Sequence, residues 1–367
     1  MSTSTVCFAV HNGALPSRVI GTRFSTGNSD PDRVMVLVYG HSGTTQVWDW
    51  QPNYSVARRF AQAGYLVITY DRLTAGASTV RPSLLGNTVT YDSDREMISE
   101  IVEQIRGTYP FPVSAPIGPC SYPGAGAGTH PKIILIGHSL GGALAGSYAG
   151  AYSAVAPVDA VVQADFSNTG DSDEANSVVD AKAASATNLR AGYATIPLDD
   201  GSTPSSKSVS AQTCRENRRL LLGAGVPISP AGYAAACDPS SFDPVPYGDF
   251  ISGAAINQED QSFIANTPSN MPVLLVFADH DCFFPPAPSS ANPTPCLSTA
   301  TGGGCDRQGC QQDEINNWRT LCPCRNNITT WVEPNSGHTF MWSQTMPEFT
   351  NTVTAWLQRV WGPNPRI

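Results

Sequence analysis

Apolar runs alternate with amphipathic segments along the first 165 residues of the chain. The runs at 33–40 (RVMVLVYG) and 64–71 (GYLVITYD) are nearly continuous, as in strands that are buried on both faces. This alternation predicts the α/β class, with a mostly parallel sheet covered by helices on both faces. The pattern predicts further strands at 18–24, 132–137, 158–165, 272–279 and 327–334, and helices at about 53–63, at 92–106, directly after Ser139 and at 346–361.

Two of these predicted helices carry a complete apolar stripe. Residues 92–106 begin with aspartates that can cap a helix, and 346–361 closes the chain as a terminal helix. Side chains at helical spacing form one face of each helix, which we expect to pack on the sheet. The stripes consist of Met97, Ile98, Ile101, Val102 and Ile105 in the first helix, and of Phe349, Val353, Trp356, Leu357 and Val360 in the second.

The alternation stops at residue 166 and resumes at 272. We therefore expect one core made of residues 1–165 and 272–367. The polar insertion 166–271 is predicted to form a cap or lid over the C-terminal edge of the sheet. A second insertion, 282–326, holds six of the ten cysteines and is predicted to be irregular. A loop of that length is rare unless something holds it, and disulfides would do so.

The strand at 132–137 runs into Gly137-His138-Ser139-Leu140-Gly141, which matches G-x-S-x-G between a strand and a helix. Side chains in place of the two glycines would collide with the neighbouring strand and helix at such a strained turn. The helix N-terminus beyond Ser139 points backbone N–H groups at the space over the hydroxyl, which favours an oxyanion. The pattern predicts that Ser139 is a nucleophile.

Together with other segments, this turn makes the chain resemble the α/β-hydrolase superfamily, and its serine esterases and lipases in particular. Residues 36–48 (VLVYGHSGTTQVW) resemble the family's strand that ends in His-Gly, with Tyr39 standing where the family usually has His. The resemblance implies that the sheet is of the eight-stranded type. It also implies that the backbone N–H groups of His41 and Leu140 form an oxyanion hole. Similar segments follow at 64–78, 272–285 and 335–340, so that the resemblance covers about 18–165 and 272–361.

The resemblance also supplies partners for Ser139, in the order serine, acid, histidine that this fold needs. His338, in NSGHTF, is implied as the base, and the acid comes from VFADHDCFFP. Alignment on the family pattern, in which the acid precedes a proline by four positions, selects Asp281, with Asp279 as the alternative. The acid would hold the histidine tautomer and stabilise the imidazolium. No spacing of histidines or carboxylates suggests a catalytic metal, and no cofactor is expected.

The remaining histidines and several aromatic residues carry weaker signals. His138 is expected to be structural, and His11 and His130 are expected in surface loops. Aromatic residues lie beside the candidate catalytic positions, which predicts an apolar acyl or aromatic pocket, although packing at the sheet edge is the alternative. The pocket candidates are Tyr39, Trp48, Phe283, Phe284, Phe340 and Trp342.

The ten cysteines lie mostly in loop-like sequence, which favours disulfides and an oxidising compartment. Asn53-Tyr-Ser and Asn327-Ile-Thr are possible glycosylation sequons. The N-terminal residues lack the features of a signal peptide, so we expect a secreted protein in mature form with an added Met, or else a cytoplasmic protein with reduced cysteines. Cys214–Cys237 is the most plausible local pair. Zinc bound by Cys305, Cys310, Cys322 and Cys324 is an alternative without the usual C-x-x-C spacing.

The net charge of −9 argues against a nucleic-acid surface, and no run of 18 apolar residues predicts a transmembrane helix. The leading hypothesis is a serine hydrolase that cleaves a small-molecule carboxylic ester or lactone through an acyl-enzyme intermediate. One alternative uses the same triad for acyl transfer, lyase chemistry or cyclisation. The other is a non-catalytic binding module with a vestigial site. The sequence predicts neither the substrate nor the oligomeric state.

Overall fold

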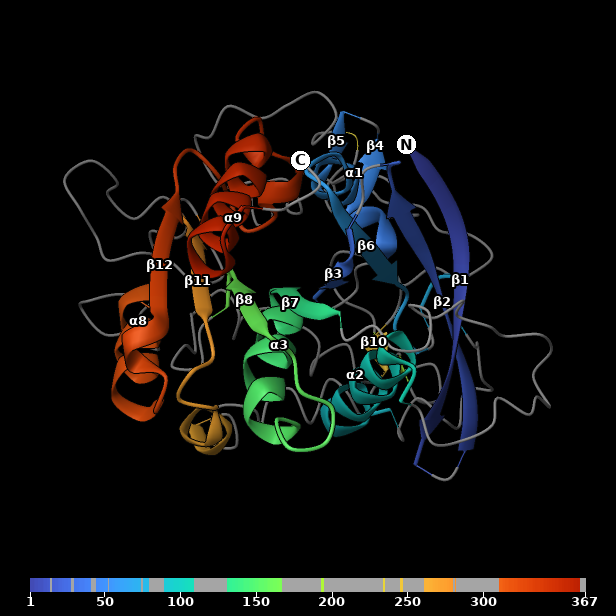
Figure 1. Cartoon of the computed structure of the whole chain (residues 1–367), viewed down its shortest axis with the longest axis horizontal. Coiled ribbons are helices and arrows are strands. Elements are labelled where there is room, and N and C mark those ends of the chain that lie inside the picture. The colour runs from blue at the N-terminus through green and yellow to red at the C-terminus, as the bar shows by residue number, and fades with distance from the viewer. Residues whose placement is uncertain are drawn as a thin grey trace.

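The centre of the molecule is a sheet of eight strands in the order β1-β2-β6-β3-β7-β8-β11-β12 (Figure 1). The computed structural model describes residues 1–13, 15–27, 30–40, 44–51, 53–73, 75–78, 89–108, 131–166, 193–194, 234, 245–246, 261–279, 281 and 310–363. β2 runs antiparallel to β1 and β6, and every neighbouring pair from β6 to β12 is parallel. The predicted fold class is confirmed. The strands are β1 (Ser2–Asn12), β2 (Leu15–Ser25), β3 (Asp30–Val38), β6 (Tyr65–Tyr70), β7 (Lys132–His138), β8 (Ala160–Ala164), β11 (Val273–Ala278) and β12 (Ile328–Glu333).

Helices cover both faces of this sheet. α1 (Val56–Gln62) and α9 (Met346–Trp361) lie on one face, and α2 (Tyr91–Arg106), α3 (Leu140–Ala151) and α8 (Cys310–Leu321) lie on the other (Figure 1). The two apolar cores correspond to these faces. Because side chains alternate along a strand, Val36 packs into the α2–α3–α8 core and its neighbour Leu37 into the α1–α9 core.

Both predicted helical stripes are present, with one exception. The five stripe residues of α2 are fully buried. In α9, Phe349, Val353, Trp356 and Leu357 are buried, but Val360 is 37% exposed, so its assignment to the packed face was wrong. Val360 lies in the last turn of α9, on the wall of an open cavity of about 830 Å³.

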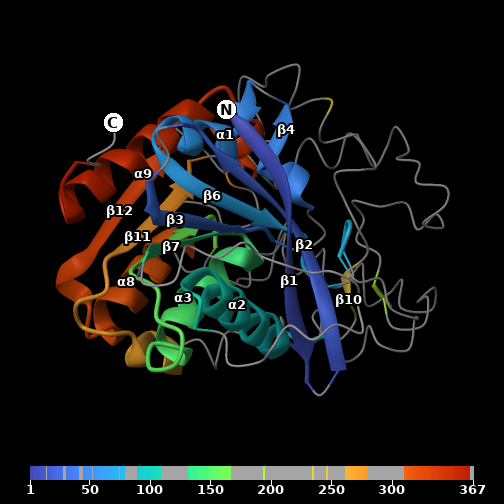
Figure 2. The same ribbon diagram turned by 45° about the vertical axis from the view of Figure 1, so that its right-hand side comes forward.

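β1 was not predicted. It pairs along its whole length with β2 at one end of the sheet (Figure 2) and buries Val6, Phe8 and Val10 on alternate positions. Its first residues are Ser and Thr, so the period-two pattern is visible only in its second half. His11 lies in this strand and not in a surface loop, since its backbone nitrogen and its Nδ1 each lie 2.6 Å from the carboxylate of Glu100.

The expectation that 282–326 is irregular was wrong for residues 310–321, which form α8. The buried face of α8 is largely polar, and this explains why a hydrophobic pattern missed it. Buried Glu314 accepts hydrogen bonds from Trp318 at 2.9 Å and from Gln163 of β8 at 2.6 Å, and buried Gln311 donates to the carbonyl of Ala278 at 2.7 Å. α8 is thereby attached to the ends of β8 and β11.

Cys322 and Cys324 form a disulfide, and Cys7 is also disulfide-bonded. Two of the four sulfurs of the zinc alternative are therefore oxidised, which contradicts that set of ligands. The predicted pair Cys214–Cys237 lies outside the described residues.

Within the predicted cap, β9 (Tyr193–Ala194) and β10 (Val245–Pro246) pair antiparallel. Most of 166–271 lies outside the described residues, so the cap stays a prediction. In the part of the chain that the structure describes, no helix combines the length and the apolar character needed to cross a membrane.

Candidate active site

Ser139 occupies a sharp turn between β7 and α3, with φ +56° and ψ −129°. Close packing explains the glycines on either side. A Cβ on Gly137 would lie 1.8 Å from the carbonyl oxygen of Gly141, and a Cβ on Gly141 would lie 2.4 Å from the carbonyl oxygen of Val38. Such distances are far below van der Waals contact, so both positions require glycine. The strained backbone of Ser139 is the kind that persists at functional sites.

Ser139 is the residue of this turn that is not buried. From 133 to 149, every residue except Ser139 is buried. Leu140 is the first residue of α3, so its backbone N–H belongs to the helix N-terminus and has no intrahelical acceptor. Gly40, after β3, lies against the serine, since a Cβ there would approach Ser139 Cβ to 2.6 Å and Oγ to 2.9 Å. His41, the other predicted member of the oxyanion hole, lies outside the described residues.

The structure places His338 beside Asp281. Nδ1 of His338 lies 2.9 Å from Oδ2 of Asp281, and the two residues are 4% and 0% exposed. His338 comes from the loop after β12, and Asp281 comes from the loop after β11, where its backbone nitrogen donates to the carbonyl of Ala278 at 3.3 Å. A carboxylate at this position holds the proton on Nδ1, so the Nε2 lone pair is the one that can accept a proton.

Asp279, the alternative acid, has different partners. Its carboxylate accepts hydrogen bonds from the backbone nitrogens of Asn335 at 2.9 Å and Ser336 at 3.1 Å. These contacts shape the loop that carries His338. The two aspartates therefore have different contacts. Asp281 contacts the imidazole of His338, and Asp279 contacts the backbone of the loop that leads to His338.

His138 lies fully inside the turn, as expected of a structural residue. Its Nε2 lies 2.6 Å from the backbone carbonyl oxygen of His338. Trp48 and Phe340 contact its ring edge-to-face, with centroids 6.3 and 5.7 Å away. Burial lowers the pKa of His138 well below its usual 6.5, and proximity to His338 lowers it further. His138 is therefore neutral, and the nitrogen that faces the carbonyl carries the proton.

Four of the six aromatic residues predicted to line a pocket pack in the core. Tyr39, Trp48, Phe340 and Trp342 are each at most 1% exposed and belong to the α1–α9 core. The hydroxyl of Tyr39 accepts a hydrogen bond from the backbone nitrogen of Arg72 at 2.7 Å. Packing at the sheet edge, the alternative, accounts for these four positions. Phe283 and Phe284 lie outside the described residues.

Sequence reasoning missed Asp165, the residue that follows β8. Asp165 is fully buried with φ +47°, and its Oδ1 accepts a hydrogen bond from the backbone nitrogen of Ala278 at 2.6 Å. Burial raises the pKa of Asp165 well above its usual value, and the charge of Asp281 raises it further. The only signal in the sequence was a lone aspartate at the end of an apolar strand.

Asp71, after β6, is a second such residue. Its Oδ1 accepts from the backbone nitrogen of Thr45 and its Oδ2 from that of Ala77, both at 2.9 Å. Gly76 lies so close to this carboxylate that a Cβ would overlap it. Asp71 thus secures the chain directly after the predicted oxyanion segment.

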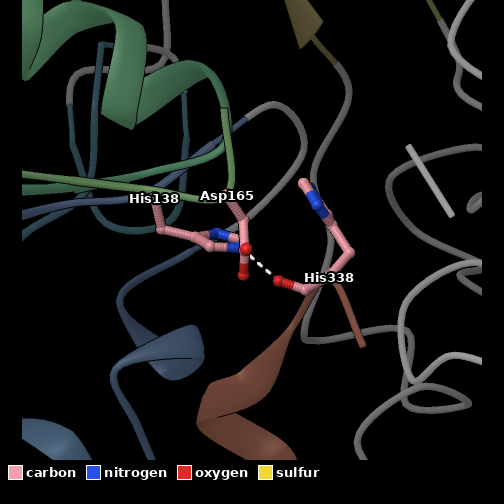
Figure 3. Close-up of side chains that lie close together, drawn as sticks. All are labelled: His138, Asp165 and His338. Carbon is pink, nitrogen blue, oxygen red and sulfur yellow. Dashed lines mark hydrogen bonds between the residues drawn. The ribbon is translucent and has the colours of Figure 1, made fainter. Parts of the chain in front are cut away.

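One group of side chains near the serine could in principle hold a metal ion. Donor atoms of His138, Asp165 and His338 lie within 4.8 Å of one another (Figure 3). Ligands of a tetrahedral zinc ion are only about 3.4 Å apart, given bonds of about 2.1 Å. One nitrogen of each histidine also already has a hydrogen-bond partner. The geometry favours a hydrogen-bonded arrangement over a metal centre.

Comparisons with known proteins agree with this architecture. The structure resembles an esterase from Thermogutta terrifontis (TM-score 0.59, 14% identity, 97% of this chain and 99% of that chain). It also resembles a bromoperoxidase from Bacillus anthracis (0.59, 16%, 97% and 100%) and a monoacylglycerol lipase from Paleococcus ferrophilus (0.55, 15%, 98% and 100%). At such identities the likeness concerns the fold alone. None of the curated proteins compared with the chain matches its sequence. The sequence pattern of the alpha/beta hydrolase family matches residues 35–352, and the chain therefore belongs to this family.

Proposed function

We propose that the protein is a serine hydrolase that cleaves carboxylic esters or lactones through an acyl-enzyme intermediate. One observation carries the proposal. The strained, non-buried Ser139 at the start of α3 lies on the same edge of the sheet as a buried histidine–carboxylate pair, His338 and Asp281. A core-packing turn needs neither the hydroxyl nor the pair. A nucleophile needs both.

The chemistry divides into two similar steps. Ser139 Oγ attacks the acyl carbon while Nε2 of His338 takes its proton, and the resulting imidazolium is stabilised by Asp281. The tetrahedral oxyanion accepts a hydrogen bond from the N–H of Leu140 and, by family resemblance, from that of His41. Collapse breaks the ester C–O bond, and His338 protonates the departing alkoxide. Water then repeats the sequence on the acyl-enzyme and releases the acid.

The contacts of the two aspartates support Asp281 as the acid of the triad. Asp281 reaches Nδ1 of His338, whereas Asp279 is occupied by backbone N–H groups. Removing the charge of a triad aspartate costs about 10⁴-fold in kcat in well-characterised serine enzymes. Asp281→Asn is expected to approach this loss. Asp279→Asn, a matched control, is expected to lose much less, because it weakens a loop and leaves the imidazole partner in place.

A fluorophosphonate probe, which reacts with activated serines, tests the proposal directly. We expect stoichiometric labelling of the wild-type protein and none of Ser139→Ala. Labelling that survives Ser139→Ala would refute the assignment, and absence of labelling in the wild type would favour a binding module. Release of free acid and alcohol from a panel of p-nitrophenyl esters and lactones would separate hydrolysis from acyl transfer, lyase chemistry or cyclisation.

We also propose that the protein is secreted, for which two observations offer support. The described cysteines include a disulfide and no free thiol. Asn53 and Asn327, the asparagines of the two sequons, are both exposed. Intact-mass measurement of protein secreted from a eukaryotic host, before and after removal of N-glycans, is expected to show a glycan mass. An unmodified protein retained inside the cell would contradict this proposal.

A further inference from the structure

A second histidine and a second aspartate lie directly behind the proposed His338–Asp281 pair. His138 is the last residue of β7 and pairs in register with Ala164 of β8, so that Asp165 follows on the neighbouring strand. Figure 3 shows the side chains of His138 and Asp165 side by side, with the carbonyl oxygen of His338 facing them. His138 is 4% exposed and Asp165 is 0% exposed. Neither residue has a step in the reaction described above.

The contact of His138 acts on the backbone of His338. Its Nε2 donates to the carbonyl oxygen of His338 at 2.6 Å, and the two imidazole centroids are 4.8 Å apart. Trp48 and Phe340 enclose the ring of His138, so the donor has little freedom to move. The residue next to the nucleophile is thus bonded to the main chain of the base. This bond sets the distance between the two elements that must meet, the serine turn and the loop after β12.

The contact of Asp165 acts on the backbone that leads to Asp281. Its Oδ1 accepts from the nitrogen of Ala278, the last residue of β11. The carbonyl of Ala278 accepts in turn from the nitrogen of Asp281 at 3.3 Å and from Gln311 of α8 at 2.7 Å. Ala278 is therefore held through both its N–H and its carbonyl, and Asp281 follows a strand end that cannot shift without breaking these bonds.

We propose that His138 and Asp165 are positioning residues that hold the base and the acid from behind, His138 through the carbonyl of His338 and Asp165 through the N–H of Ala278. This inference rests on the proposed function, because it needs His338 and Asp281 to be the working pair. It assigns His138 and Asp165 no contact with the substrate. Their effect is to keep His338 within reach of Ser139 while Asp281 stays on Nδ1.

The charges around Asp165 fit this role. The carboxylates of Asp281, Glu333 and Asp279 face it, together with the imidazoles of His138 and His338. Burial and these acidic neighbours raise the pKa of Asp165, which favours its neutral form, and its Oδ2 makes no hydrogen bond with a described residue. A neutral Asp165 can accept from Ala278 without adding a second negative charge beside Asp281. The imidazolium then interacts with one carboxylate instead of two.

His138→Phe, which keeps a ring and removes the donor, tests the first contact. Kinetics are measured per active site, counted by fluorophosphonate titration, with a p-nitrophenyl ester as substrate. Because a displacement of about 1 Å can cost about 100-fold, we expect kcat to fall by about 10- to 100-fold while KM stays within about threefold. The acid limb of kcat/KM is expected to move to lower pH, since a displaced Asp281 stabilises the imidazolium less. His138→Gln, whose side-chain amide can donate to the same carbonyl, is expected to recover most of kcat.

His11→Phe is the matched control for this change. His11, like His138, makes a side-chain hydrogen bond, in its case to Glu100, but it lies in β1. The kinetic parameters per active site are therefore expected to stay at wild-type values. Wild-type kcat and an unchanged acid limb in His138→Phe would overturn the role of His138. So would His138→Gln behaving like His138→Phe.

Asp165→Ala tests the second contact and does not depend on how well the His138 variants fold. We expect kcat to fall by about tenfold with the same displacement of the acid limb, and Asp165→Asn, which keeps an acceptor oxygen, to recover it. Asp159→Ala is the matched control. Asp159 also accepts a backbone N–H, that of Ile133 at 2.8 Å, but at the opposite end of β8. Its loss is expected to reduce stability without moving the acid limb.

The outcomes separate this inference from the proposed function. A wild-type protein that the probe does not label would refute the proposed function itself. A wild type that is labelled at Ser139, with Asp165→Ala at wild-type kcat and an unchanged acid limb, would overturn the role of Asp165 alone. An Asp165→Asn variant as impaired as Asp165→Ala would also overturn it, because the acceptor oxygen would then not be what matters.

Discussion

Glu333, the last residue of β12, offers a sharp test of the electrostatics around the site. Its side chain is 0% exposed, and neither carboxyl oxygen makes a well-formed hydrogen bond with a described group. Burial raises the pKa of Glu333 well above its usual 4.5. The nearby Thr345 hydroxyl opposes this rise, and the negative charges of Glu348 and Asp279 add to it. We predict that Glu333→Gln stabilises the protein, and that the gain grows with pH.

The sign follows from proton linkage. Between the unfolded pKa and the raised folded pKa, the folded protein binds the proton of Glu333 and the unfolded chain has lost it. The free energy of unfolding therefore decreases as pH rises through this window. Each pH unit within it changes the free energy of unfolding by about 1.4 kcal/mol, because that is the energy of one pKa unit. Glutamine carries no proton to lose, so the variant escapes this decrease and gains relative to the wild type from about pH 5 upward.

Thermal unfolding over pH 5 to 8 provides the assay. For a chain of 367 residues, a change of about 1.4 kcal/mol corresponds to a Tm difference of about 2 °C per pH unit. Glu96→Gln, an exposed carboxyl in α2, controls for the removal of one negative charge, and its effect is expected to stay within about 0.5 kcal/mol. A Glu333→Gln curve that runs parallel to the wild type at all pH values would refute the reasoning. So would destabilisation at pH 8.

Three further predictions concern packing. Gly137→Ala places a methyl group 1.8 Å from a carbonyl oxygen. In a denaturation assay it is expected to lower the free energy of unfolding by more than about 3 kcal/mol or to prevent folding. Gly27→Ala, with open space around it, is the control and should fold normally. Gly40→Ala crowds the hydroxyl of the elbow serine and should slow fluorophosphonate labelling by at least about tenfold with little loss of Tm; labelling at the wild-type rate would contradict the placement of this loop. Phe349→Ala should cost about 3–5 kcal/mol by urea unfolding and Val360→Ser less than about 0.5; similar costs would contradict the orientation of α9.

The sequence was most informative where a hydrophobic pattern alone decides the structure. Residues 346–361 form a helix with the predicted bounds, and the apolar stripe of α2 is buried as predicted. The pattern failed where buried positions are polar. α8 packs through Gln311 and Glu314, whose partners come from other elements, and no local period reveals such a face. Burial of a polar side chain depends on hydrogen bonds that only the tertiary structure supplies.

The site was predictable to the extent that each residue has a local signature. The turn around Ser139 requires glycines at fixed positions, and a strand end followed by an acid or a histidine can be recognised in the sequence. Asp165 and the second role of His138 had no such signature, because both depend on the register between neighbouring strands. The aromatic residues show the opposite error. Trp48 and Phe340 stand beside candidate catalytic residues in the sequence, but their side chains point into the α1–α9 core.

Asp281 must carry a charge in the proposed reaction, whereas burial disfavours the charged forms of Asp165 and Glu333 at the same edge of the sheet. Stability and catalysis are therefore expected to conflict here. Parallel strands bring their C-terminal ends together. β8 runs directly into buried Asp165, β12 ends in buried Glu333, and the loop after β11 carries buried Asp281. Asp281 must be ionised to stabilise an imidazolium, and its charge disfavours ionisation of Asp165. Burial raises the pKa of both Asp165 and Glu333, so the folded protein loses stability as pH rises from the unfolded pKa of these groups towards their folded pKa. Replacement of Glu333 should increase the stability at high pH and leave the proposed catalytic residues in place, because Glu333 contacts neither His338 nor its carbonyl. Replacing Asp281 should recover stability only by removing the charge on which the proposed reaction depends.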